Sequence, residues 1–156
     1  MDNRINELKA ILVENQELCT SLAKTIDAMS LEKASTVQAA RATLALLMQR
    51  LKPERVSDDV KLNLNWQVAI SLSSMITSNQ STAAYNRSAH SIVISRTYWK
   101  NIEADERYEV IIHELVHTVQ HAFGENNATY DNDAEAYAIS EYLVDMKFPR
   151  MKKVEA

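Results

Sequence analysis

Three of the four histidines of this chain lie within nine positions of one another, in the segment "YEVIIHELVHTVQHAFG" at residues 108–124. His113, Glu114 and His117 form the pattern H-E-L-V-H. Residues four apart lie one turn apart on a helix, so both imidazoles can bind one metal ion at about 2 Å from each nitrogen. The glutamate between them then lies beside the water that such an ion binds. The pattern predicts a zinc site with Glu114 as the general base.

The helical wheel of this segment supports that prediction. At about 100° per residue, His117 lies about 40° from His113 and Glu114 lies about 100° from it. The apolar residues fill a separate arc from roughly 160° to 300°: Tyr108, Ile111, Ile112, Leu115, Val116, Val119, Ala122 and Phe123. We therefore expect the histidines to face away from the core. The alternative is that they are ordinary core or surface histidines.

His121 continues the four-residue series but does not fit the same ion. It lies about 12 Å along the helix axis from His113. The extended pattern with a third histidine ligand needs glycine and histidine where Gln120 and Phe123 stand. A third ligand must therefore come from further along the chain, and we expect His121 behind the ligands or at the surface.

The best candidate for the third ligand is Glu135, in the segment "YDNDAEAYAISEYLVDM". On a helical wheel this carboxylate lies within about 80° of an apolar stripe: Ile139, Tyr142, Leu143 and Met146. An unpaired charge that points inward is costly, and a metal ion would supply the partner. Two alternatives stay open. Glu135 would form a capping box with Asn132, or Asp131 or Asp133 would supply the ligand.

Apolar spacing and turn residues predict the helices and strands that carry these side chains. We expect one helix from about Asp105 to Phe123, ending at Gly124, and a last helix from about Asp133 to Lys147. "ENNATYDN" between them reads as a loop, and "ERVSDDVKLNLN" at 54–65 as a linker or irregular edge. "WQVAISL", "STAAYN" and "HSIVISRTYW" predict about three strands.

Residues 2–52 read as two helices in an antiparallel hairpin. An apolar seam of heptad type runs through the first helix, interrupted at Asn15. Ser30 can cap the second helix, which ends before Pro53. The second apolar stripe contains Val37, Ala40, Leu44, Leu47 or Met48, and Leu51. The hairpin would pack on the rest of the domain, or it would form a homodimer or bind a partner.

Residues 66–147 resemble the zincin metallopeptidases of the glutamate-ligand (gluzincin-like) kind. The resemblance rests on a strand that leads into the helix with "HELVH", followed by a loop and a second helix with "AEAYA". The order of "TAAYNRSAHSIVISRTYW" and "EVIIHELVHTVQH" is also similar to that in compact SprT-like zinc proteases. The resemblance implies a minimal zincin fold and peptide hydrolysis.

The expected fold class is therefore α+β. A helical hairpin at 1–52 would precede a zincin-like metallopeptidase domain at 53–156, the two forming one compact unit. Zn²⁺ would be held by His113, His117 and Glu135, with Glu114 as the catalytic base of a metalloprotease. Oxyanion stabilisation usually needs another donor; Tyr130, Tyr142 and His121 are candidates, and the sequence assigns none of them. The strand "HSIVIS" would pair with an extended protein or peptide substrate.

A second function class is a non-catalytic zinc-binding interaction protein that acts through the hairpin. The two classes differ in coordination, because a structural zinc site is closed by four protein ligands while a catalytic site keeps one position open. Glu114 favours catalysis, since zinc binding alone has no use for it. A third reading joins the two classes, with the hairpin restraining an active peptidase or recruiting its substrate.

The composition of the chain argues against several other classes of protein. The 156 residues suit one domain, and 46% hydrophobic with 24% charged residues is typical of globular proteins. A net charge of −4 with scattered basic residues gives no expectation of nucleic acid. Gly124 is the single glycine, which excludes glycine-rich phosphate loops. The lone Cys19 and the absence of a signal or spanning run lead us to expect a cytoplasmic protein without a membrane partner.

Overall fold

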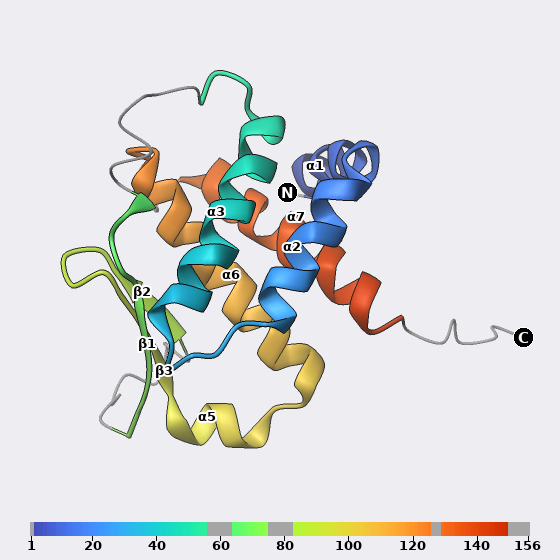
Figure 1. Cartoon of the computed structure of the whole chain (residues 1–156). Helices are drawn as coiled ribbons and strands as arrows, with labels where there is room; N and C mark the ends of the chain where they lie inside the picture. The colour runs from blue at the N-terminus through green and yellow to red at the C-terminus, as the bar shows by residue number, and fades with distance from the viewer. Residues whose placement is uncertain (1, 56–63, 75–82, 126–128, 150–156) are drawn as a thin grey trace, which may run out of the picture.

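The computed structural model describes residues 2–55, 64–74, 83–125 and 129–149. It is an α+β fold with a small mixed sheet at one side of a group of helices (Figure 1), as the sequence predicts. The helices are α1 (Asp2–Glu14), α2 (Gln16–Asp27), α3 (Ala34–Leu51), α5 (Arg96–Asn101), α6 (Ala104–Ala122) and α7 (Tyr130–Lys147). The strands are β1 (Ala69–Ser73), β2 (Ala83–Asn86) and β3 (Ser91–Ser95).

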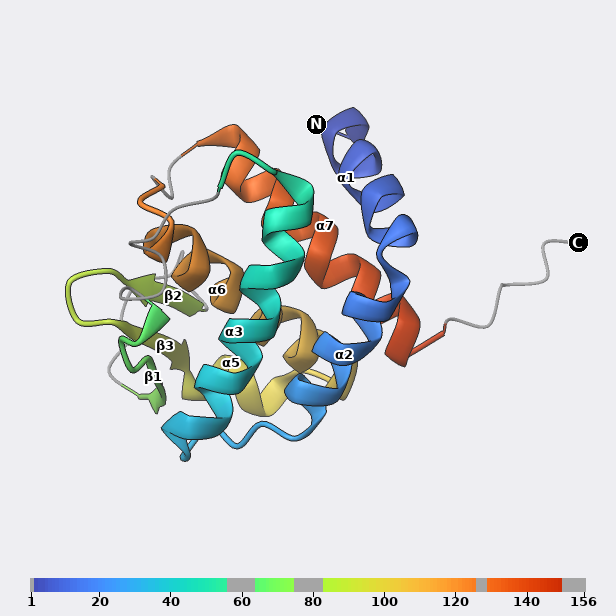
Figure 2. The same ribbon diagram turned by 45° about the horizontal axis from the view of Figure 1, so that its top comes forward.

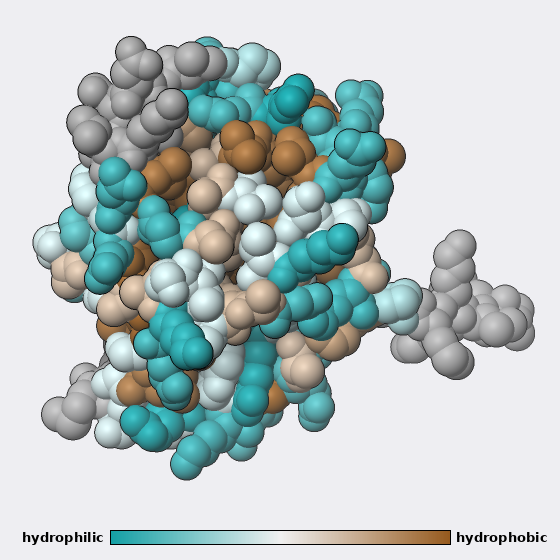
Figure 3. All heavy atoms as spheres, viewed as in Figure 1, coloured by the Kyte–Doolittle hydropathy of each residue, from teal (hydrophilic) through white to brown (hydrophobic). Residues whose placement is uncertain are grey.

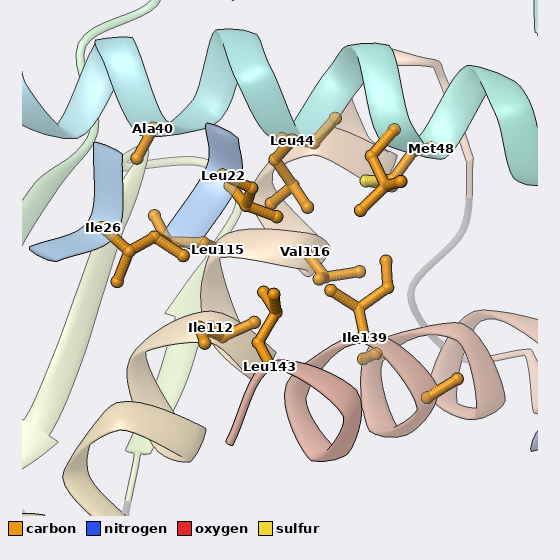
Figure 4. Close-up of a cluster of buried hydrophobic side chains, with 14 of the residues drawn as sticks. Leu22, Ile26, Ala40, Leu44, Met48, Ile112, Leu115, Val116, Ile139 and Leu143 are labelled. Carbon is orange, nitrogen blue, oxygen red and sulfur yellow. The ribbon is translucent and has the colours of Figure 1, made fainter. Parts of the chain in front are cut away.

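Helix α6 is the central element, because it packs against α3, α7 and β2. Figure 2 shows it behind α3 and beside the sheet. Almost every residue from Ile111 to Gln120 is buried. Polar residues outside the apolar arc of the helix are therefore buried as well. Side chains from α2, α3, α6 and α7 meet in one core (Figure 4). They include Leu22, Leu44, Met48, Leu115, Val116, Ile139 and Leu143.

The N-terminal region contains three helices where the sequence predicted two. Asn15 separates α1 from α2 with φ −116° and ψ 41°, so the predicted polar interruption of the seam is a break in the helix. Helices α2 and α3 form the antiparallel hairpin, whereas α1 packs mainly on α7 (Figure 1). The predicted cap at Ser30 is wrong. Lys33 precedes α3, and the backbone of Ser30 hydrogen-bonds the hydroxyl of Thr36.

The apolar seam of these helices faces the core of its own chain. Its buried members on α1 and α2 are Ile5, Leu8, Leu12, Cys19, Leu22 and Ile26. Those on α3 are Val37, Ala40, Leu44, Leu47, Met48 and Leu51. These residues form one continuous core with α6 and α7. This matches the expectation that the hairpin packs on the rest of the domain.

The three predicted strands are confirmed, in the order β1-β3-β2. β3 pairs in parallel with β1 and antiparallel with β2. The prediction that "HSIVIS" adds a substrate strand is therefore wrong, because both edges of β3 are already paired. The prediction of a strand through "RTYW" is also wrong. Ser95 ends β3 and accepts a hydrogen bond from the backbone N–H of Tyr98, which starts α5.

Helices α6 and α7 agree closely with prediction, apart from their first residues. Helix α6 begins at Ala104 after Glu103, and Gly124 follows its end with φ +79°, a conformation that favours glycine. Helix α7 begins three residues earlier than predicted, since Thr129 accepts from the backbone N–H of Asn132. The predicted capping box with Asn132 is therefore wrong.

Most of the predicted linker at 54–65, and residues 126–128 of the predicted loop, lie outside the described residues. Among the helices that the structure describes, none combines the length and the apolar character needed to cross a bilayer.

Candidate metal centre

The side chains of His113 and His117 converge on one point beside α6. Their Nε2 atoms lie 3.2 Å apart, and the rings are nearly perpendicular, at 80°. Two nitrogens that share a tetrahedral zinc at about 2.0–2.1 Å are about 3.3–3.4 Å apart. The pair therefore has the spacing that a shared ion requires. His117 is buried and His113 is half-buried.

Asp133, in the first turn of α7, supplies an oxygen to the same point. Its Oδ1 lies 3.7 Å from the Nε2 of His117. Donor atoms of His113, His117 and Asp133 all lie within 4.8 Å of one another. Asp133 is half-exposed, with a side-chain exposure of 55%. The structure thus brings together the two predicted histidines and one of the alternative acids.

Glu135, the residue expected to be the third ligand, is not part of this group. It does point inward, as its wheel position predicts, with 1% exposure. Its partner is Arg55, whose Nη1 and Nη2 donate to the two carboxylate oxygens at 2.6 Å. The guanidinium therefore neutralises the buried charge for which sequence reasoning invoked a metal. Arg55 lies 80 positions away in the predicted linker, and no local pattern connects the two residues.

Glu114 lies on the side of α6 that faces the sheet, next to the converging histidines. Burial raises the pKa of its carboxyl to about 7, and the negative charge of Asp133 adds to this. The backbone N–H of Tyr85 on β2 donates a hydrogen bond to it and partly opposes the rise. Glu114 is thus a buried carboxyl of raised pKa that the edge strand of the sheet hydrogen-bonds.

His113 is kept neutral by its surroundings. Burial lowers the pKa of its imidazole to about 4, and the neighbouring His117 contributes in the same direction. Because a metal binds the unprotonated imidazole, no proton has to be removed from this ligand near neutral pH.

A hollow of about 210 Å³ opens beside these residues. It is lined by Ala83, Glu109, Val110, His113, Glu114 and Tyr137. The ring of Tyr137 lies 4.7 Å from that of His113 and is 40% exposed. Sequence reasoning did not single out Tyr137. The available signal was its spacing, because Asp133 and Tyr137 are four residues apart and share one face of α7.

The other residues considered from the sequence lie elsewhere. The Nδ1 of His121 is 2.9 Å from the hydroxyl of Tyr85, and its ring packs against Trp66 and His90. This agrees with the expectation that His121 does not share the ion. Among the suggested oxyanion donors, Tyr142 donates to Gln16 on α2, and Tyr130 is exposed at the start of α7.

The donor set fits zinc. Two imidazole nitrogens and one carboxylate oxygen are common zinc ligands, and three protein ligands are the number that catalytic zinc sites use. Comparison with family models, with curated proteins and with solved structures finds no match to this chain. Function must therefore be inferred from the geometry of these residues.

Proposed function

We propose that this protein is a zinc-dependent metallopeptidase in which His113, His117 and Asp133 hold the metal and Glu114 is the general base. The observation that carries the proposal is the convergence of the two Nε2 atoms, 3.2 Å apart, beside Asp133. This revises the expected ligand set by replacing Glu135 with Asp133. The expected zincin fold remains part of the proposal.

Each residue has a chemical task in the proposed reaction. Zinc, when bound, supplies Lewis acidity that polarises a carbonyl group and lowers the pKa of water toward neutrality. Glu114 accepts a proton from the attacking water and returns it to the departing amine nitrogen. A base works best when its pKa lies near the working pH, and burial brings that of Glu114 to about 7.

The hollow beside Glu114 offers room for a protein or peptide substrate. Its position over His113 and Glu114 would bring a peptide carbonyl to the reacting groups. Tyr137 lines the same hollow, and we include it as the side chain most suited to contact that carbonyl. It replaces Tyr130, Tyr142 and His121, the donors suggested by the sequence.

The rival function is that of a non-catalytic zinc protein that acts through its N-terminal helices. Two observations favour catalysis. In the part of the chain that the structure describes, the candidate group has three ligands, which leaves a position for substrate or water. A buried carboxyl with a pKa near 7 also lies next to it. Zinc binding alone would need neither feature.

The test is a comparison of wild type with Glu114→Gln, both loaded with zinc. We expect both proteins to hold one zinc per chain by elemental analysis. Cleavage of casein and of a mixed peptide library should fall at least about 100-fold in Glu114→Gln, since general bases contribute about 10²–10⁴ in rate. Glu106→Gln is the matched control, because Glu106 is exposed in the first turn of the same helix and bonds Tyr98.

Two results would contradict the proposal. One is wild-type protein that binds zinc but cleaves none of these substrates, which would favour the rival function. The other is equal cleavage by wild type and Glu114→Gln, which would mean that the observed activity does not come from this site.

A further inference from the structure

Gln120 is a buried amide between the metal centre and the Arg55–Glu135 ion pair. Its Nε2 donates to the backbone carbonyl of Asn132 at 2.9 Å and to Oε1 of Glu135 at 3.0 Å. Both of these partners can only accept, so the amide cannot be turned around without losing both bonds. The oxygen of Gln120 is therefore the end that faces His117.

This orientation determines the tautomer of His117. Oε1 of Gln120 lies 2.8 Å from Nδ1 of His117, and an amide oxygen can only accept. Nδ1 must therefore carry the proton. In a neutral imidazole the other nitrogen, Nε2, then has the free lone pair. That atom is the one directed at His113 and Asp133.

The other end of this chain of bonds is fixed by Arg55. All five N–H groups of its guanidinium have partners: they donate to both oxygens of Glu135, to both oxygens of Glu125 and to the carbonyl of Met48. The Arg55 side chain is 3% exposed and that of Glu135 is 1% exposed. An ion pair buried this deeply and bonded this completely has little freedom to move. Glu135 therefore presents a fixed acceptor to Gln120.

We propose that Arg55, Glu135 and Gln120 are positioning residues that hold His117 in its Nδ1–H tautomer and so set the affinity of the centre for zinc. The inference rests on the proposed function in so far as the centre binds zinc. It gives Glu135 a role different from the expected one, because Glu135 acts on the metal through Gln120 and His117. Residues that support a metal ligand in this way typically change affinity by about 10–100-fold.

A merely structural role for the same residues makes a different prediction. The ion pair joins the end of α3 to α7 and to the segment after α6. Losing it would therefore lower the free energy of unfolding whether or not the protein binds a metal. A structural role would leave the tautomer of His117 and the intrinsic zinc affinity unchanged. Stability and zinc affinity must therefore be measured separately.

The first experiment measures the metal-free wild-type protein, and a variant serves only to assign the signals. Two-bond ¹⁵N–¹H correlation spectra of protein labelled at histidine nitrogens distinguish the two neutral tautomers. We expect His117, assigned by comparison with His117→Asn, to carry its proton on Nδ1. A proton on Nε2 would overturn the inference, whatever the protein does with zinc.

The second experiment measures zinc dissociation constants by competition with a chelator, alongside thermal unfolding of the metal-free proteins. Gln120→Met keeps the side-chain volume but removes both ends of the amide, and we expect zinc to bind about 10–100-fold more weakly. Gln120→Glu keeps an acceptor for the Nδ1 proton and, with its buried carboxyl protonated, a donor toward Glu135 and the carbonyl of Asn132. We expect its zinc affinity to stay within about threefold of wild type or to exceed it. Equal weakening in both variants would overturn the inference.

Thr118→Val is the matched control. Thr118 lies on the same helix, is fully buried, accepts from Nε of Arg41 and donates to the carbonyl of Leu115. Its loss should lower the unfolding temperature without changing zinc affinity. If wild type does not bind zinc, the proposed function fails. If wild type binds zinc and Gln120→Met binds it equally well, the inference alone fails.

Discussion

Asp133 and Glu135 lie two residues apart on α7 and have different partners. Residues at this spacing point to different sides of a helix, so one reaches the histidine pair and the other reaches Arg55. The wheel predicted correctly that Glu135 is buried. It could not predict the partner, because the neutralising cation lies 80 positions earlier. Asp133 is half-exposed, and burial therefore gave no signal for it.

The assignment of Asp133 as a ligand can be tested against a neighbour of the same type. We expect Asp133→Ala to weaken zinc binding at least about 100-fold, more than the loss of a supporting residue does. Asp131→Ala is the control, because Asp131 lies in the same turn with similar exposure, 56%, and pairs with Arg4. Chelator competition measures both. If Glu135→Gln weakened binding more than Asp133→Ala, Glu135 would be the ligand after all.

Cys19 has a thiol that the folded structure keeps from ionising. Its side chain is fully buried in α2, and burial raises the pKa of the thiol from 9.0 to about 11. Because the folded state favours the thiol form, this stabilisation is complete below pH 9 and is lost as the pH rises to about 11. At pH 8 we expect alkylation by iodoacetamide to be slow in the native protein and fast in denaturant.

The control for Cys19 is to measure the stability of wild type and of Cys19→Ala over a range of pH. The difference in unfolding midpoint between wild type and Cys19→Ala should change between pH 9 and 11 and stay constant below pH 9. Rapid alkylation of the native protein would show that the thiol is accessible.

At the scale of the elements, hydrophobic period and turn residues predicted most of the fold. Hydrophobic period identified α6 and α7, and β-branched and aromatic runs between Ser, Asn and Gln clusters identified the three strands, with alternation clearest in β3. Prediction failed where a hydrogen bond from the backbone to a nearby hydroxyl determines where a helix begins. The hydroxyl of Ser95 turns a β-branched and aromatic run into α5. Thr129, rather than Asn132, caps the start of α7.

The beginning of α7 matters to the site, because Asp133 lies in its first turn. We expect Thr129→Ala to lower the free energy of unfolding by about 1 kcal/mol, since it removes the hydroxyl that accepts from the N–H of Asn132. Thr43→Ala is the control, because Thr43 is half-buried on α3 and its hydroxyl donates only to the carbonyl of Ala39 in the preceding turn, so it caps no helix. Urea unfolding measures both. Equal effects would mean that Thr129 does not act as a cap.

The strand order could not be predicted, because it depends on contacts between distant segments. Alternation in "HSIVIS" correctly indicated that Ile92 and Ile94 face the core. It gave no information on whether β3 has one neighbour or two. With both edges of β3 paired, the backbone of β2 is the part of the sheet that contacts Glu114.

At the scale of the whole molecule, the N-terminal helices belong to the same core as the candidate metal centre. The face that they leave exposed is a groove of about 630 Å³ between α1, α2 and α3. Its apolar lining residues are Ile11, Leu18, Leu46 and Pro53. Figure 3 shows apolar side chains exposed on the face formed by α3 and α1. The heptad seam itself is not available to a partner, because it is buried.

Two leucines of α3 allow a test of which side of this helix belongs to the core. Leu44 is fully buried, whereas Leu46 is 54% exposed. We expect Leu44→Ala to lower the free energy of unfolding by about 2–5 kcal/mol through a cavity in the shared core. Leu46→Ala should change it by no more than about 0.5 kcal/mol. A large loss of stability for Leu46→Ala at high protein concentration only would instead indicate self-association through the groove.

The pairing of α1 with α7 has a consequence for synthesis in the cell. Lys9 of α1 binds Glu141 of α7, 132 positions later, at 2.7 Å. A growing chain therefore exposes the apolar face of α1 until nearly all of the described residues have left the ribosome. Closing so long a loop is slow relative to local helix formation. Nascent chains that stall before α7 should therefore be bound by chaperones through this helix.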